Sequence, residues 1–326
     1  METRVLRENG IDEAVRLLKA GEVVAVPTET VYGLGADARN ARAVEKVFEA
    51  KGRPSDNPLI VHIASMDMLK GVAVSVPDVA YKLFARFSPG PLTVVLKKAG
   101  GIPAITTGGL STVGVRIPNH PLTLKLIERA NIPLAAPSAN TSGHVSPTKA
   151  VHVHDDLDGK IPLILDGGEC TVGVESTIVD LTTKPPRILR AGGITEKELR
   201  IILPDVVVGK VDDGKALAPG MKYAHYRPRC EAKLVRNIEE AVAVANDSGE
   251  ATYILGEKSF FMGKSVAMAT VLGENATECQ KNLYGMLRML EKKAKLILIQ
   301  EFAECAENRA LINRIQKATG GEYARK

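Results

Sequence analysis

The amino-acid sequence predicts an α/β protein built as two units with a linker between them. Short apolar runs rich in Val and Ile alternate with segments of helical period up to about residue 200, which is typical of an α/β or α+β domain. Residues 203–229 then become rich in Gly, Pro and charge, without a regular period. From residue 230 strands and helices alternate again, which predicts a small parallel sheet. We therefore expect domains at 1–202 and 230–326, joined by a linker at 203–229.

Most elements expected in the first domain are short. A first helix begins near Asp12 and ends at Gly21, and a buried strand follows at 23–26. Later strands are expected at 59–63, 92–97, 114–117, 132–136, 162–165, 176–181 and 188–191, and later helices around 43–48, at 77–87 and at 122–131. In the second domain we expect strands at 232–235, 251–255, 266–271 and 296–300, and helices at 238–245, 279–293 and 311–318.

Composition restricts the classes of function. Hydrophobic residues make up 45% and charged residues 25% of the 326 residues, as in a globular protein. Aromatic residues are only 4% and Trp is absent, which argues against a surface of stacked rings for single-stranded RNA. The net charge of +5 suits an anionic ligand or a transient tRNA contact, but no long run of Lys and Arg supports either.

The expected location is the cytoplasm. The four cysteines show no C-x-x-C spacing, so we expect reduced thiols rather than a disulfide framework or a zinc site. The first residues contain no apolar segment of a secretory signal, and no stretch reaches the ~18 apolar residues of a membrane span. The sequence therefore predicts no membrane association.

Residues 27–53 contain the first candidate ligand site. They follow the strand at 23–26 and are expected to form a polar turn with Thr28, Tyr32 and two glycines, then a helix. A strand, a polar turn and a helix form anion pockets in α/β proteins. Lys51 and Arg53, at the far end, can both reach one phosphate, but cations at a helix end also complement its dipole. The motif alone favours the second explanation.

Further candidates follow other expected strands. Ser138 and Asn140 stand in a turn that offers hydroxyl, amide and backbone N–H groups to phosphate, although an ordinary polar loop has the same composition. Arg116 lies inside an apolar strand and needs an anionic partner if it is buried. His62 ends another strand, and Ser176 begins one; both are compatible with a purely structural role.

Two further patterns resemble other types of site. Residues 33–38 fit the G-x-G-x-x-A pattern of dinucleotide-binding proteins, with Asp56 about 20 residues on, but Pro27 interrupts the tight turn that this site requires. A nucleotide-dependent oxidoreductase therefore remains a weak alternative. His152, His154, Asp155 and Asp156 are metal-ligating residue types, yet they stand in a hydrophilic, surface-like segment, so we expect no metal held by the protein alone.

Several segments, in this order, resemble the threonylcarbamoyl-AMP synthase family in its long form. They are PTETVYGLGADA, the K-x-R at Lys51 and Arg53, NPLIVHI, SPGPLTVVL, VGVRIPNHP, the S-x-N at Ser138 and Asn140, ESTIVDL, and the linker segment APGMKYAHYRP. The resemblance implies a YrdC-like domain with a twisted mixed sheet and a concave ligand cleft. A smaller, Rossmann-like parallel α/β domain is expected to follow it.

The same resemblance implies an ATP-dependent nucleotidyltransferase. L-threonine, bicarbonate and ATP would give threonylcarbamoyl-AMP and pyrophosphate, and other proteins would transfer the threonylcarbamoyl group to the tRNA adenosine beside the anticodon. The residues expected to act in catalysis are Lys51, Arg53, Ser138 and Asn140. ATP is expected to contact Lys51, Arg53, Asn57, Thr112, Ser138, Asn140, Ser146, Arg190 and Tyr226. Threonine is expected to contact Thr28, Tyr32, His62, Arg116, Ala136 and Ser176.

Mg²⁺ is the implied cofactor, bound mainly through the phosphates of ATP. The linker, through residues 223–227, is the candidate lid over the labile intermediate. The alternative from another class is a tRNA- or double-stranded RNA-binding protein without chemistry, which would show salt-dependent RNA affinity and no ATP turnover.

Overall fold

The fold is described from a computed structural model, which describes residues 2–209, 225–248, 251–264, 266–305 and 307–324. The chain forms two compact units. Unit 1 comprises the chain up to 142 and continues from 147 to 209, and unit 2 comprises residues 143–146 and the described chain from 225 on. Most of the expected linker, including Tyr223, lies outside the described residues.

Unit 1 is built on one large mixed sheet. The strands follow the spatial order β1 (Arg4–Leu6), β9 (Leu163–Leu165), β2 (Val24–Val26), β3 (Gly33–Asp37), β8 (Leu134–Ala135), β4 (Ile60–His62), β7 (Thr112–Arg116), β6 (Leu92–Lys98), β10 (Thr177–Asp180), β11 (Arg187–Arg190) and β12 (Val207–Val208), with β5 (Ala73–Val74) paired to β6. Parallel pairs such as β4–β7 stand beside antiparallel pairs such as β6–β7. The expected mixed sheet is thus confirmed.

The segment after β2 differs from its expected form. Residues 33–37 are a strand, β3, which pairs antiparallel with β2, so a β-hairpin precedes the helix. A side chain at Gly33 would place its Cβ 3.3 Å from that of Ala136, which explains why a residue without a side chain suits this close strand contact. The G-x-G-x-x-A match therefore lies in a strand and not in a phosphate-binding turn, so the dinucleotide interpretation is wrong.

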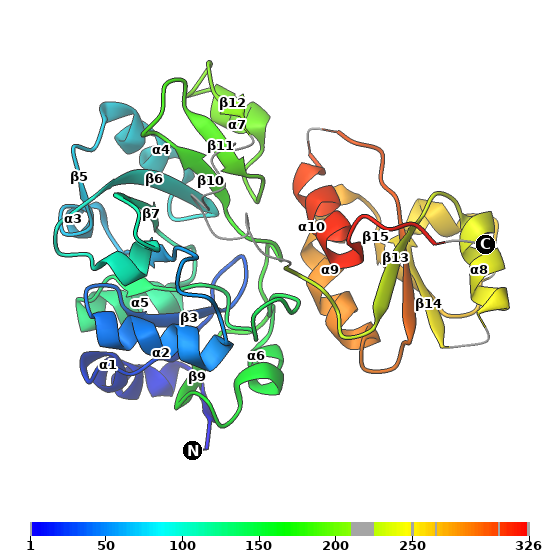
Figure 1. Cartoon of the computed structure of the whole chain (residues 1–326), viewed down its shortest axis with the longest axis horizontal. Coiled ribbons are helices and arrows are strands. Elements are labelled where there is room, and N and C mark those ends of the chain that lie inside the picture. Colours follow the sequence, from blue (N-terminus) through cyan, green and yellow to red (C-terminus); the bar gives the residue numbers. More distant parts are fainter. Residues whose placement is uncertain (1, 210–224, 249–250, 265, 306, 325–326) are drawn as a thin grey trace. The chain divides into compact units, whose positions relative to one another are not determined.

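Helices cover both faces of this sheet. Alternation along β2 sends Val24 and Val26 to one face and Ala25 to the other. The first face packs on α1 (Ile11–Lys19) and α5 (Pro121–Ala130), which lie side by side in Figure 1. The larger core on the second face includes α2 (Ala41–Lys51), α4 (Asp78–Phe87) and α6 (Ala150–Leu157). Short helical segments are η1 (Glu8–Gly10), α3 (Met66–Leu69), η2 (Ala104–Thr107) and α7 (Glu196–Arg200).

Helix α6 corrects the expectation of a surface-like segment at 152–156. His152 and Asp156 are buried on it. Their polar atoms bind nearby backbone: His152 Nδ1 accepts from the Thr148 N–H at 3.2 Å, and Asp156 Oδ2 accepts from the Thr141 N–H at 3.1 Å. His152 and Asp156 therefore hold the backbone that follows the S-x-N turn. The composition of residues 152–156 did not indicate this role.

Unit 2 is a small parallel α/β domain, as expected. Its sheet has the order β13 (Glu231–Val235), β16 (Leu296–Gln300), β14 (Thr252–Glu257) and β15 (Ala269–Gly273), with every pair parallel. Figure 1 shows α8 (Ile238–Asp247) on one side of this sheet and α9 (Ala276–Leu290) with α10 (Arg309–Thr319) on the other; η3 (Lys258–Phe261) follows β14. None of the described helices is both long and apolar enough to cross a bilayer.

Candidate active site

The residues expected to hold threonine come from segments that meet at one end of the unit 1 sheet. His62 and Arg116 are register partners at the ends of the parallel strands β4 and β7. Arg116 Nε donates to the Gly90 carbonyl at 3.2 Å, and the next carbonyl, of Pro91, accepts from the N–H of Thr177, which follows Ser176. The turn at Gly90 and Pro91 therefore connects Arg116 to the start of strand β10, where Ser176 lies. His62 lies beside Arg116 in the sheet.

Arg116 is buried and has the anionic partner that a buried strand arginine requires. Its guanidinium Nη2 lies 2.7 Å from Glu29 Oε2, and both side chains are only 4% exposed. The two groups are within ion-pair distance but are not aligned as a hydrogen bond, so both Glu29 oxygens and Nη2 lack a hydrogen-bond partner among the described residues. Glu29 was not among the predicted site residues, although the need of Arg116 for a partner pointed to an acid.

His62 is a neutral histidine. Burial, and then the positive charge of Arg116, lower its pKa to about 3. Its Nδ1 lies 3.3 Å from the Ile60 carbonyl. His62 can therefore take part in hydrogen bonds at this site without adding charge, and Arg116 remains the cation that a carboxylate would meet.

Ser176 contacts Arg190, a residue that was expected in a different part of the site. Its hydroxyl lies 2.7 Å from that of Thr93 and accepts from Arg190 Nη2 at 3.1 Å. Arg190 Nε also donates to the Ser176 carbonyl at 3.0 Å. Arg190 was predicted to contact ATP and Ser176 to contact threonine, and the structure brings the two together.

Three further residues expected to contact threonine lie in the segments around the β2–β3 turn. Thr28 is buried, and its hydroxyl donates to the Val31 carbonyl at 2.6 Å, which closes the turn. The Tyr32 hydroxyl donates to the Gly168 carbonyl at 2.7 Å, and burial raises its pKa. The Ala136 N–H donates to the Ile60 carbonyl at 3.0 Å. These contacts hold the turn and its neighbours in one arrangement.

The K-x-R and S-x-N motifs, far apart in sequence, are joined through Lys51. Its side chain is 2% exposed, and Nζ donates to the carbonyl oxygens of Ser138 at 2.6 Å and Asn140 at 2.5 Å. The Ala139 N–H donates to the Tyr32 carbonyl at 2.8 Å, so the same turn is tied to the β2–β3 hairpin. Lys51 therefore shapes the turn that was expected to bind phosphate.

The other residues expected to contact the nucleotide lie nearby in unit 1. Arg53 Nη2 donates to the Pro58 carbonyl at 3.4 Å. Asn57 is 1% exposed, and neither of its amide atoms has a hydrogen-bond partner among the described residues. Thr112 lines a narrow cavity with Pro58 and Thr93. Gly52, with φ of 61°, ends α2 and turns the chain between Lys51 and Arg53.

Two of the residues expected to contact ATP belong to unit 2. Ser146 is buried and ends the segment 143–146. Tyr226 is also buried, and its ring stacks on Tyr284 with centroids 5.5 Å apart. The Arg314 guanidinium lies 5.2 Å from the same ring. These contacts show how Tyr226 packs in unit 2, and its contact with ATP stays a prediction.

Comparison with known proteins assigns the family. Residues 16–192 match the family model described as "Telomere recombination", and residues 194–320 match the model described as "Threonylcarbamoyl-AMP synthase, C-terminal domain". The threonylcarbamoyl-AMP synthase of Pyrococcus abyssi is 44% identical, with 94% of this chain and 93% of the relative covered. The chain belongs to the threonylcarbamoyl-AMP synthase family. The Bacillus subtilis member is 42% identical, over 97% of this chain and 94% of the relative.

Solved structures of the family agree with this fold. The crystal structure of P. abyssi Sua5 complexed with L-threonine has a TM-score of 0.91 and 43% identity, and covers 98% of both chains. The structure of Escherichia coli YciO, at 23% identity and a TM-score of 0.52, covers 58% of this chain and 96% of its own, and its likeness supports the fold alone. The two-domain form of the family thus extends over this chain.

The arrangement is suited to binding and orientation. A buried guanidinium, a neutral imidazole and a serine hydroxyl are groups that bind a small polar acid. The turn held by Lys51 presents backbone and side-chain groups of the kind that bind phosphate oxygens. Among the described residues, no cluster of three or more His, Cys, Asp or Glu could hold a metal ion.

Proposed function

We propose that this chain is an ATP-dependent L-threonylcarbamoyladenylate synthase. It joins L-threonine, bicarbonate and ATP, releases pyrophosphate, and so performs the first step of threonylcarbamoyladenosine formation on tRNA. The observation that carries the proposal is the buried Arg116 beside neutral His62 in a fold whose close relative was crystallised with L-threonine. A buried cation at the end of two parallel strands is a fitting partner for an amino-acid carboxylate.

The proposed reaction depends on positioning. The threonine nitrogen bonds to the carbon of bicarbonate, with loss of water and a proton, and gives a carbamate. A carbamate oxygen then attacks the α-phosphorus, and the bond to pyrophosphate breaks. Lys51 holds the 138–140 turn for the phosphates, and Arg53 adds a second cation. Fixed donors and charges of this kind supply much of the catalysis in phosphoryl-type transfer.

Mg²⁺ enters the proposal as a companion of ATP. Magnesium commonly binds through substrate phosphates with few protein ligands. When bound, it would neutralise charge on the phosphates. We further propose that the product passes to proteins that transfer the threonylcarbamoyl group to tRNA, and that direct tRNA contact is weak. We also propose that the protein works in the cytoplasm.

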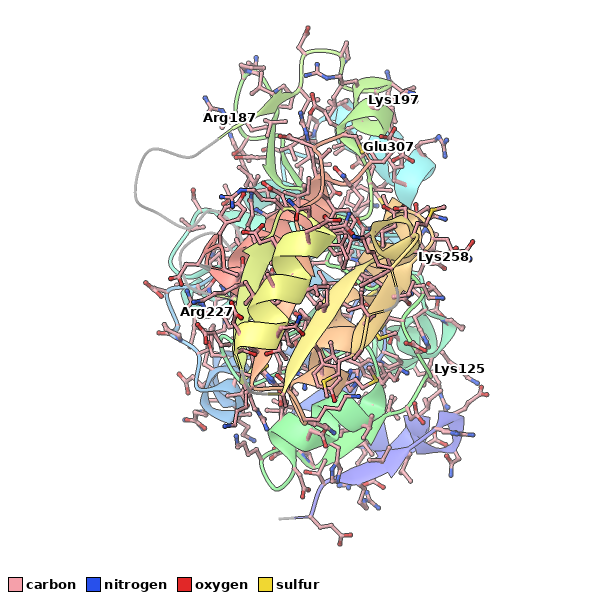
Figure 2. The ribbon with its side chains drawn as sticks, turned by 90° about the vertical axis from the view of Figure 1, so that its right-hand side faces the viewer. Lys125, Arg187, Lys197, Arg227, Lys258 and Glu307 are labelled. Atoms are coloured by element: carbon pink, nitrogen blue, oxygen red, sulfur yellow. The ribbon has the colours of Figure 1, made fainter. Side chains whose placement is uncertain are left out.

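RNA binding without chemistry explains less of the molecule. Figure 2 labels cationic side chains that come from several separate elements. In unit 1 Lys125 pairs with Glu8, and in unit 2 Lys258 pairs with Glu274, with nitrogen to oxygen distances of 2.7 and 2.6 Å. Such pairs reduce the charge available to a phosphate backbone. The buried groups around Arg116 also have no part in that function.

Pyrophosphate release from Mg-ATP tests the proposal. We expect release that requires both L-threonine and bicarbonate, and that falls at least about 100-fold in Arg53→Ala and Asn140→Ala, as when a stabilising group of the transition state is removed. Lys125→Ala, which removes an exposed cation, is the matched control and should keep full activity. Folded protein without threonine-dependent release, together with salt-dependent RNA affinity, would favour the RNA-binding alternative.

A further inference from the structure

The carboxylate of Glu29 has no role in the reaction as described so far. Its backbone is fixed, because the Val172 N–H donates to its carbonyl at 2.7 Å. Its side chain is 4% exposed, and neither oxygen has a hydrogen-bond partner among the described residues. Burying a carboxylate without hydrogen bonds is costly, so such a group calls for an explanation in function.

The charges around Glu29 form a simple set. Burial lowers the pKa of His120, and burial followed by the charge of Glu29 raises the pKa of the Cys170 thiol. Both groups interact with Glu29, and both are neutral near pH 7. Arg116 and Glu29 remain as one cation and one anion, 2.7 Å apart. Nη2 of Arg116 also has no hydrogen-bond partner among the described residues. Both ions of the pair therefore keep unused hydrogen-bonding capacity in a buried place.

We propose that Glu29 accepts the ammonium group of the amino-acid substrate while Arg116 binds its carboxylate. A free amino acid at neutral pH carries one anion and one cation on neighbouring atoms, which is the complement of the Arg116–Glu29 pair. This inference rests on the proposed function, because that function supplies threonine as the ligand. Glu29 then selects amino acids over hydroxy acids and places the nitrogen that must become nucleophilic.

The other possible role of Glu29 is to hold Arg116 in place. The two roles differ in a measurable way. If Glu29 only orients Arg116, its loss should weaken every carboxylate ligand in parallel. If Glu29 binds the ammonium group, its loss should weaken amino acids but strengthen an anion without the amine, because the charge of Arg116 is then uncompensated.

Calorimetry on the wild-type protein is the first arm of the test. The ligands are L-threonine and 2,3-dihydroxybutanoate of the same configuration, in which a hydroxyl replaces the ammonium group. We expect the hydroxy acid to bind roughly 10- to 100-fold more weakly, as for the loss of a hydrogen bond between charged groups. Equal affinity for both ligands would overturn the assignment of Glu29, and this arm needs no variant to fold.

Glu29→Gln is the second arm, with Glu169→Gln as the matched control, because Glu169 is a half-exposed acid in the same domain. Glu29→Gln should bind L-threonine roughly 10- to 100-fold more weakly and the hydroxy acid more tightly than the wild type does. A parallel loss for both ligands, or no change, would overturn the inference. If wild-type protein fails to bind L-threonine at all, the proposed function itself fails.

Discussion

At the scale of single residues, His62 shows how burial decides chemistry. A histidine at a strand end in the sequence gives no sign of its charge. The structure places it in the core opposite Arg116, where burial and then that cation lower its pKa to about 3. A protonated His62 would repel Arg116 and give substrate carboxylates a second cation. Keeping it neutral leaves recognition of the carboxylate to the guanidinium.

The titration of His62 predicts a pH dependence of stability. Its folded pKa lies below the unfolded value of about 6.5, so the unfolded state binds the proton first as the pH falls. Stability is therefore fully present above about pH 6.5 and is lost progressively towards pH 3. Between pH 7 and pH 5 we expect wild type to lose up to about 2 kcal/mol more unfolding free energy than His62→Gln, as measured with urea. Equal losses in the two proteins would show that His62 is protonated in the folded state.

Arg116 predicts a loss specific to threonine. Arg116→Gln removes the cation but keeps a hydrogen-bonding side chain of moderate size. Because truncating one side of a buried charge pair costs about 2–5 kcal/mol, threonine affinity should fall at least about 30-fold. ATP affinity should stay within about threefold of the wild type, since the side-chain contacts of Arg116 with the described part of the chain are with Glu29 and the Gly90 carbonyl. An equal loss for ATP would contradict the division of the site into two parts.

At the scale of elements, Lys51 connects helix α2 to the S-x-N turn. Lys51→Met keeps the length of the side chain but removes two hydrogen bonds from a charged donor in a buried place. We expect the free energy of unfolding to fall by about 2–4 kcal/mol. Lys46→Met on the same helix is the control; its half-exposed pair with Glu22 should contribute less than about 1 kcal/mol. Chemical denaturation of both variants measures the two losses of unfolding free energy. A Lys51→Met protein as stable as Lys46→Met would contradict the structural role of Lys51.

The segment 143–146 is held by contacts inside unit 2. His144 Nε2 lies 2.9 Å from both Glu291 oxygens, and Arg288 Nε donates to the Val145 carbonyl at 3.1 Å. Burial raises the pKa of Glu291, but hydrogen bonds from His144 and the Arg229 N–H outweigh it, and the net shift is downward. His144→Ala leaves a buried acid without its main partner.

We expect His144→Ala to lower the free energy of unfolding by about 1–3 kcal/mol. It should also raise the KM for ATP, since Ser146, a residue predicted to contact ATP, ends this segment. His154→Ala is the control, because that histidine is half-exposed on α6. Urea unfolding and ATP titration measure the two effects. An unchanged KM beside reduced stability would separate the segment from the nucleotide site.

At the scale of the whole molecule, the sequence predicted the two-unit α/β organisation and most strands. Apolar runs such as 92–97 and 296–300 stand out because their side chains are buried on both faces. Helix α6 was missed because its charged residues bind backbone inside the protein. The hairpin at 33–37 was missed because glycines normally weaken a strand. Only the packing of Ala136 against Gly33 and of Leu134 against Gly35 shows why glycines suit this one.

The candidate site was predicted unevenly for a similar reason. The order of the motifs indicated Arg116, Lys51 and the S-x-N turn. The cost of burying an unpaired guanidinium indicated that an acid must face Arg116. Neither could select Glu29, since the partner stands 87 residues away in sequence and only the fold brings the two to 2.7 Å. The contact of Arg190 with Ser176 depends on the β10–β11 pairing in the same way.

Detection of the product with labelled bicarbonate tests the central claim most directly. The full chain is incubated with Mg-ATP, L-threonine and ¹³C-bicarbonate, and the nucleotides are analysed by mass spectrometry. We predict a threonylcarbamoyl-adenylate whose mass increases by one carbon label, formed only when threonine is present. Formation of AMP or ADP without any labelled adduct, from protein shown to be folded, would contradict the account.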